Sequence, residues 1–204
     1  MKPLILSLSL LFALHVASAQ ALFKIVPGRS GNEAQFKSDA PMETVVGTAH
    51  TLTGFVELDP ASDGTGARGE VHVDLTSLKT GIELRDRHMR ENHLETDTYP
   101  ETVFILSSIT LPAGGLRESE RTRVTVNGTL RLHGVEHQIQ PETYITLGSS
   151  GSGSSLHVES SFVVSLPDYQ IKRPQFLVMR LAEEQRINVE FTAVSNTSVA
   201  IESK

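Results

Sequence analysis

The chain has 204 residues, of which 39% are hydrophobic, and its formal net charge is −6. It contains no cysteine and no tryptophan. This length and balance are typical of one folded domain, and the lack of cysteine excludes disulfides, thiolate metal sites and thiol catalysis. The negative charge disfavours nucleic acid as a partner, because phosphates attract a positive surface.

Residues 1–19 have the features of a secretory signal peptide. Lys2 precedes an apolar run from Leu4 to Val16, and Ala17-Ser18-Ala19 gives the small-x-small pattern that favours cleavage before Gln20. That run is too short to span a bilayer, and no other apolar stretch of the sequence is long enough. We therefore expect residues 20–204 to form a single exported domain, periplasmic or secreted, with no integral membrane segment.

Most of the remaining chain follows the alternating pattern of β-strands. Val71, Val73 and Leu75 alternate with polar residues, which is the period-2 pattern of a half-buried strand. Similar patterns predict strands over residues 23–26, 34–37, 52–58, 70–75, 103–109, 124–132, 135–147, 156–166 and 187–193. Turn-forming residues separate several of them, at 59–69, 112–115 and 148–155, and we interpret the last as a long hairpin loop.

The register of one hairpin can be predicted. Apolar positions are even-numbered before Gly134 and odd-numbered after it. A two-residue turn at His133-Gly134 would pair Leu132 with Val135 and place the apolar residues of both strands on one face. About eight to ten such strands, each with one buried face, predict an all-β fold, either a sandwich or a closed barrel.

Residues 80–92 break this pattern and predict a short helix. Thr80 can cap its start, and Glu83 and Arg87 have the i,i+4 spacing of a helical ion pair. A helix this short and this charged needs a surface to lie on. We expect it to lie across one end of the barrel and close it.

Three motifs could carry chemistry, and each has a simpler structural interpretation. Residues 64–69 match G-x-G-x-x-G, but a strand rather than a helix follows, which favours a hairpin loop over a nucleotide site. His72 and Asp74 share a strand face, yet without a third ligand a solvated outer face is favoured over a metal site. His133 and His137 have a zinc-pair spacing that has meaning only on a helix.

Charged side chains are dense in the predicted helix. Arg85, Asp86, Arg87, His88 and Arg90 could form an acid–base group or an anion-binding patch. A solvated helix with internal ion pairs is the simpler interpretation, because charge runs usually face solvent.

Four motifs in order resemble those of the YceI-like family of exported lipocalin-like proteins. They are Ser77-Leu78-x-Thr80-Gly81, Arg85-Asp86-x-His88-Met89-Arg90, Tyr99-Pro100-x-x-x-Phe104 and Gly128-x-Leu130-x-Leu132-His133-Gly134-Val135. The resemblance runs from Leu22 to Val194. It implies an antiparallel lipocalin-like β-barrel with one short helix capping an end. It also implies non-catalytic binding, sequestration or transport of a long-chain polyisoprenoid or quinone-like lipid, with no other cofactor.

A small barrel can hold one ligand, and a long isoprenoid tail needs only a dry apolar tube. The inward series of the strands is predicted to include Phe55, Val73 and Val126. The residues expected to contact the lipid, from this series and the helix, are Leu75, Leu78, Ile82, Arg85, His88, Met89, Phe104, Leu130, Leu132, Phe162 and Phe176. A polar or phosphorylated head group would be met by Arg85, Arg87, His88 and Arg90 of the helix.

Two other functions stay open on the sequence alone. A small lipid-modifying enzyme could use His88 and Asp86 as acid and base, whereas a barrel with a filled interior would be a stress or structural protein. The volume of the cavity distinguishes the filled structural barrel from a lipid-binding protein or an enzyme. An exposed edge or apolar rim could also make a homodimer, which the sequence does not decide.

Overall fold

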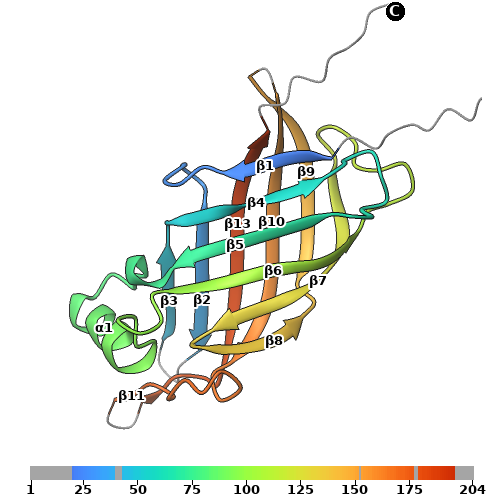
Figure 1. Cartoon of the computed structure of the whole chain (residues 1–204). Helices are drawn as coiled ribbons and strands as arrows, with labels where there is room; N and C mark the ends of the chain where they lie inside the picture. Colours follow the sequence, from blue (N-terminus) through green and yellow to red (C-terminus); the bar gives the residue numbers. More distant parts are fainter. Residues whose placement is uncertain (1–19, 40–42, 152, 177–178, 196–204) are drawn as a thin grey trace, which may run out of the picture.

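The computed structural model describes residues 20–39, 43–151, 153–176 and 179–195, and for residues 175, 176, 179 and 180 it describes the backbone alone. The expected signal peptide, residues 1–19, lies outside the described residues. The described part contains one short α-helix, α1 (Glu83–His88), and thirteen strands (Figure 1). The strands are β1 (Ala21–Ile25), β2 (Glu33–Asp39), β3 (Thr44–Ala49), β4 (Leu52–Leu58), β5 (Arg68–Asp74), β6 (Glu101–Thr110), β7 (Arg121–Leu132), β8 (Val135–Ile139), β9 (Glu142–Ser150), β10 (Gly153–Ser165), β11 (Gln175–Phe176), β12 (Met179–Arg180) and β13 (Glu184–Ser195).

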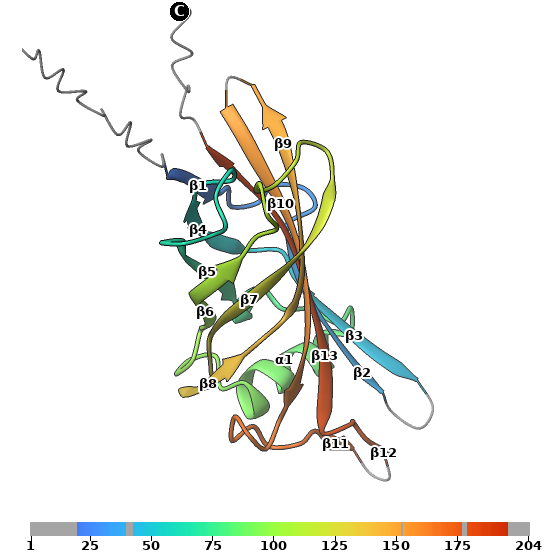
Figure 2. The ribbon, with the colours of Figure 1, turned by 90° about the vertical axis from the view of Figure 1, so that its right-hand side faces the viewer.

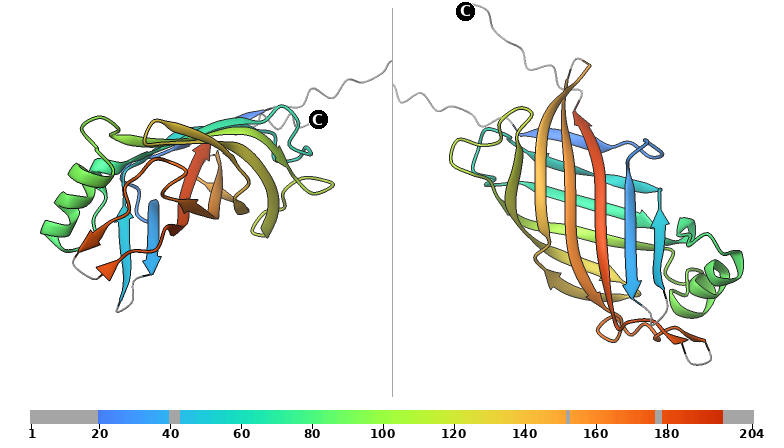
Figure 3. Two further views of the ribbon diagram at one scale, coloured as in Figure 1. Left: turned by 90° about the horizontal axis from the view of Figure 1, so that it is seen from below. Right: turned by 180° about the vertical axis from the view of Figure 1, so that it is seen from behind.

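Eight of these strands form a closed antiparallel barrel. Their order is β1-β4-β5-β6-β7-β9-β10-β13, and the ring closes where Lys24 of β1 pairs with Val194 of β13. Strands β2 and β3 extend the sheet from β13, and β8 pairs with β7. Strands β4, β5 and β6 form one wall and β9, β10 and β13 the other, as Figure 1 and the view from behind in Figure 3 show. The predicted all-β barrel with one short helix is confirmed.

The β7–β8 hairpin has the predicted register. Leu132 pairs with Val135, and the two turn residues between them, His133 and Gly134, have φ values of 51° and 76°. Positive φ at both positions is the geometry of the tight turn that matches strand twist, and glycine adopts it without steric cost. A Cβ atom at Gly134 would also lie 2.8 Å from the Tyr99 ring, so the turn fits closely against its neighbour.

Three predictions about the strands were wrong. Residues 148–155 are not a long loop, because β9 continues to Ser150 and β10 begins at Gly153, with Ser149 paired to Ser154. The predicted strand over 135–147 is divided into β8 and β9 at Pro141, which lacks the N–H that a ladder needs. Strand β3 was missed, although it pairs with β2 along its whole length.

The predicted helix over 80–92 is shorter and begins differently. Helix α1 ends at His88, and a π-helical turn over Met89–His93 follows it. Thr80 does not cap the helix, because its backbone N–H and its hydroxyl both donate to Asp86 Oδ1, at 2.7 and 2.6 Å. Asp86 is buried, and its Oδ1 accepts both of these hydrogen bonds.

Helix α1 lies at the lower end of the barrel, near the ends of β2, β3 and β13, and in side view between the two walls (Figures 1 and 2). No helix among the described residues is both long and apolar enough to cross a membrane. The most deeply buried side chains, Phe23, Leu52, Leu58 and Leu156, come from three different strands and belong to the larger of two apolar clusters. These clusters do not fill the interior.

Candidate functional site

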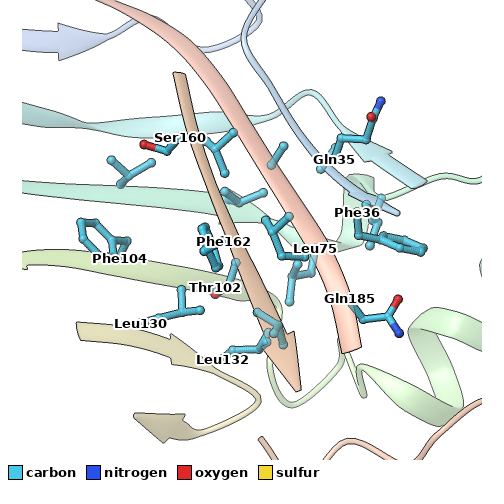
Figure 4. A pocket seen from close by; sticks show the side chains of 18 of the residues that line it. Gln35, Phe36, Leu75, Thr102, Phe104, Leu130, Leu132, Ser160, Phe162 and Gln185 are labelled. Carbon is cyan, nitrogen blue, oxygen red and sulfur yellow. The ribbon is translucent and has the colours of Figure 1, made fainter. Parts of the chain in front are cut away.

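A cavity of about 670 Å³ occupies the interior of the barrel. This volume lies within the range of roughly 300–1,000 Å³ that is usual for small-molecule sites. Figure 4 shows aliphatic and aromatic side chains pointing into it from the opposed walls. A barrel with a purely structural role would have a close-packed core, so a cavity of this size disfavours that alternative.

Strand alternation builds the lining. On β10, Leu156, Val158, Phe162 and Val164 all line the cavity, whereas Val163 faces outward and is 55% exposed. Successive side chains of a strand point to opposite faces, so one apolar set per strand covers the inner wall. The cavity is therefore a direct product of the period-2 pattern.

Ten of the eleven residues predicted to contact a ligand line this cavity: Leu75, Leu78, Ile82, Arg85, His88, Met89, Phe104, Leu130, Leu132 and Phe162. Phe176 lies in β11, and its side chain is not among those described.

Of the inward series, Val73 and Val126 also line the cavity. Phe55 was placed wrongly, because its neighbour Val56 lines the cavity and successive residues of a strand face opposite sides.

Several lining residues were not predicted. Val45 comes from β3 and was missed with that strand, whereas Phe36 comes from β2, which was predicted without its inward side chains being assigned. Ile187, Val189 and Phe191 follow the same alternation as the rest of β13, so their inward position could have been predicted from the sequence.

Three polar side chains of the lining, Thr143, Ser160 and Gln185, bond to other protein groups. Thr143 Oγ1 donates to the Pro141 carbonyl and lies 2.9 Å from Ser160 Oγ. Gln185 Nε2 donates to the Ala182 carbonyl at 2.7 Å. Donors that already have partners do not demand a polar ligand, so these groups leave the wall suited to a hydrocarbon.

Arg85 stands at the rim of the cavity beside α1 and is held by protein groups. Its Nε donates to Thr80 Oγ1 at 2.7 Å, and its Nη2 donates to the Thr80 carbonyl at 3.2 Å. Its Nη1 donates to Glu43 Oε1 at 3.2 Å. A guanidinium with a carboxylate partner is a weaker anchor for an anionic head group than a free one.

His93 is a rim residue that the sequence did not point to. Its Nδ1 lies 2.9 Å from the Lys172 carbonyl, which can only accept, so Nδ1 carries the proton. Burial lowers the pKa of His93, and the nearby charges of His88 and Lys172 lower it further against the opposing effect of the carbonyl bond. The imidazole is therefore neutral at pH 7 and leaves Nε2 as an acceptor.

The other motifs have structural roles. Residues 64–67 lie in the loop between β4 and β5, as predicted, whereas Arg68 and Gly69 already belong to β5 and pair with β4. His72 lies between two carboxylates, with Glu70 Oε1 2.9 Å from its Nε2 and Glu101 Oε2 3.0 Å from its Nδ1. Asp74 accepts instead from the Thr76 N–H, at the start of a 3₁₀ turn. Within the described ranges, no group of three or more His, Asp or Glu side chains could hold a metal ion.

One family model matches most of the chain. The model of the YceI-like domain matches residues 23–193. None of the curated proteins matches the chain significantly.

Three solved structures share the fold. BcnA of Burkholderia cenocepacia is 17% identical, with a TM-score of 0.63 over 79% of this chain and 96% of BcnA. A polyisoprenoid binding domain from Saccharophagus degradans, implicated in plant cell wall breakdown, is 18% identical, with a TM-score of 0.63 over 85% and 98% of the two chains. The YceI protein of Campylobacter jejuni is 15% identical, with a TM-score of 0.62 over 76% and 88%.

Proposed function

Because the chain belongs to the family of YceI-like domains, we propose that it binds a long-chain isoprenoid-type lipid in the barrel cavity and sequesters or carries it chemically unchanged. The Saccharophagus degradans domain, described as polyisoprenoid-binding, has the same fold. The ligand would be a polyisoprenoid or quinone-like lipid.

The observation that carries this proposal is the apolar interior of about 670 Å³, in which the polar side chains of Thr143, Ser160 and Gln185 already bond to protein groups. Each buried methylene contributes about 0.8 kcal/mol. A tail of about ten carbons thus gains roughly 8 kcal/mol, which offsets much of the estimated 4–15 kcal/mol lost on association. Affinity would come from the length of the tail.

Binding without catalysis is favoured by the environment of the candidate acid–base pair. Asp86 is buried, and its Oδ1 accepts two hydrogen bonds from Thr80. Those bonds tie the carboxylate to the turn before α1 and occupy one of its two oxygens. The structure of this helix therefore disfavours Asp86 and His88 as an acid–base pair.

We also propose that the protein is exported after removal of residues 1–19. The sequence pattern at Ala19 and Gln20 supports cleavage between them. N-terminal sequencing of the mature protein should begin at Gln20, and a mature chain that begins at Met1 would contradict the assignment.

Lipid extraction tests the main proposal. The protein is purified under mild conditions without detergent, extracted with organic solvent, and the extract is analysed by mass spectrometry. We expect a prenyl-chain lipid in near-stoichiometric amount, and purified polyprenol should bind to protein from which lipid has been removed. If repeated extractions yield no lipid and added polyprenol does not bind, the proposal fails.

A further inference from the structure

The rim of the cavity at α1 exposes large apolar side chains. Ile82 is 53% exposed and Leu84 is 55% exposed, among the highest values for large apolar residues in the described part of the chain. Both also line the cavity. The exposed apolar surface is therefore continuous with the apolar interior.

Two exposed cations without carboxylate partners stand at the same rim. Leu84 and Arg87 are three residues apart on α1 and share a face. Lys172 is placed there by its carbonyl, which accepts from Nδ1 of His93, another lining residue. Within the described ranges, neither Arg87 nor Lys172 has an ion pair.

Neighbouring cations differ in this respect. Arg85 is paired with Glu43 at 3.2 Å, and Arg173 is paired with Glu183 at 3.0 Å. Unpaired positive charge at the rim contrasts with the net charge of −6 for the chain. Such a patch is complementary to a surface of negative charge.

We propose that the rim patch, defined as Ile82, Leu84, Arg87 and Lys172, docks the barrel on a lipid bilayer that carries anionic head groups. The two apolar side chains would enter the interface, and the two cations would lie at head-group level. The purpose of docking rests on the proposed function, since a water-insoluble tail could then pass between bilayer and cavity without crossing water.

The size of the patch favours a bilayer over a second protein. A stable protein interface buries about 800 Å² on each partner, and two exposed apolar side chains supply only part of that. Reversible attachment to a membrane needs no more than a few inserted apolar groups and some positive charge. Docking would also explain why large apolar side chains are exposed beside the entrance.

Vesicle co-sedimentation tests the docking. The mature protein is mixed with vesicles of phosphatidylethanolamine and phosphatidylglycerol, and separately with vesicles of phosphatidylcholine alone. Arg87→Gln/Lys172→Gln should bind the anionic vesicles about 25-fold more weakly, at about fivefold for each cation. Added salt should weaken wild-type binding in the same way. Ile82→Ser/Leu84→Ser should weaken binding to both kinds of vesicle by at least about tenfold.

Matched controls come from exposed residues on and after β1. Leu22→Ser/Val26→Ser removes two apolar side chains that are 40% and 41% exposed. Lys24→Gln/Arg29→Gln removes two exposed cations. Both controls should bind vesicles like the wild type, and equal losses in the controls and the rim variants would overturn the proposal.

The result separates docking from ligand binding. Arg87 and Lys172 do not line the cavity, so Arg87→Gln/Lys172→Gln should retain bound lipid while it loses vesicle binding. Unchanged vesicle binding by both rim variants would overturn docking alone, and a wild type that binds vesicles but never contains lipid would overturn the proposed function alone. A dimer in sedimentation velocity that Ile82→Ser/Leu84→Ser dissociates would show that a second copy covers the rim, which also overturns docking.

Discussion

Val158 and Val163 offer a direct test of where a lipid tail lies. Both are valines of β10, but Val158 lines the cavity and is 7% exposed, whereas Val163 faces outward and is 55% exposed. A Val158→Trp variant would place an indole in the cavity, and Val163→Trp would place the same ring outside. The natural chain has no tryptophan, so each variant would contain a single one.

The expected loss of affinity follows from the space that the ring takes. An indole at position 158 displaces about four methylenes of a bound tail, each worth about 0.8 kcal/mol. The loss of about 3 kcal/mol corresponds to a roughly 200-fold weaker Kd. Val163→Trp should leave the Kd unchanged. The cavity of about 670 Å³ accepts the ring, so both variants should melt cooperatively near the wild-type temperature.

Titration with a fluorescent polyene-chain lipid measures the Kd of each protein. The emission of the single tryptophan checks its placement, since a ring in an apolar cavity emits at shorter wavelength than one in water. A folded Val158→Trp protein that binds the probe as tightly as the wild type would refute a tail in the cavity. Equal weakening by Val163→Trp would point to a general disturbance of β10.

Three further predictions concern stability. Burial lowers the pKa of His93 below its ordinary value of 6.5, so as the pH falls the unfolded state takes up a proton first and the free energy of unfolding should fall below pH 6.5. His93→Gln should remove this part of the pH dependence when the free energy of unfolding is measured by urea titration at several pH values. An unchanged pH dependence would contradict the prediction. Gly134→Ala and Gly114→Ala should each cost about 1–2 kcal/mol because both φ values are positive, but Gly134→Ala should cost more in thermal unfolding, since its Cβ meets an aromatic ring while that of Gly114 meets nothing within 4 Å. Asp86→Asn should lower the free energy of unfolding by about 1.5–3 kcal/mol through its weakened hydrogen bonds, and a loss no larger than that of Glu83→Gln on the exposed side of α1 would contradict the role given to Asp86.

The parts of the fold that local rules determine could be predicted. Alternation depends only on neighbours along one strand, which is why β7, β10 and β13 were predicted and ten of the eleven predicted contact residues line the cavity. The turn at His133 and Gly134 was equally accessible, because a change of phase between two adjacent strands fixes their register.

Composition misled where the backbone alone decides the structure. The ends of β9 and β10 are rich in glycine and serine but pair through main-chain hydrogen bonds that any residue except proline can make. Strand β3 was hidden in a similar way by Gly47. A Cβ atom there would lie 2.2 Å from the Phe36 ring, so the glycine makes room for an aromatic side chain of β2.

The environment of the rim depends on partners that are distant in sequence. Glu43, which binds Arg85, is 42 residues away, and the carbonyl of Lys172, which fixes His93, is 79 residues away. Spacing within residues 80–92 could therefore indicate a charged helix but not which charges are free. Arg85 has a carboxylate partner, whereas Arg87 has none among the described residues, and this difference is visible only in the structure.

The closure of the barrel between β1 and β13 has a consequence for how the chain folds. Lys24 pairs with Val194, and Asn32 Oδ1 accepts from the Thr192 N–H, 160 residues away. Such distant pairings carry a large loop-closure entropy and slow the search for the native topology. The ring cannot close until β13 has left the ribosome, so the chain stays open throughout synthesis. An open chain is the state that a secretion channel accepts, which fits the proposed export. Removal of β13 would leave β1, β2 and β10 with unpaired edges prone to aggregation.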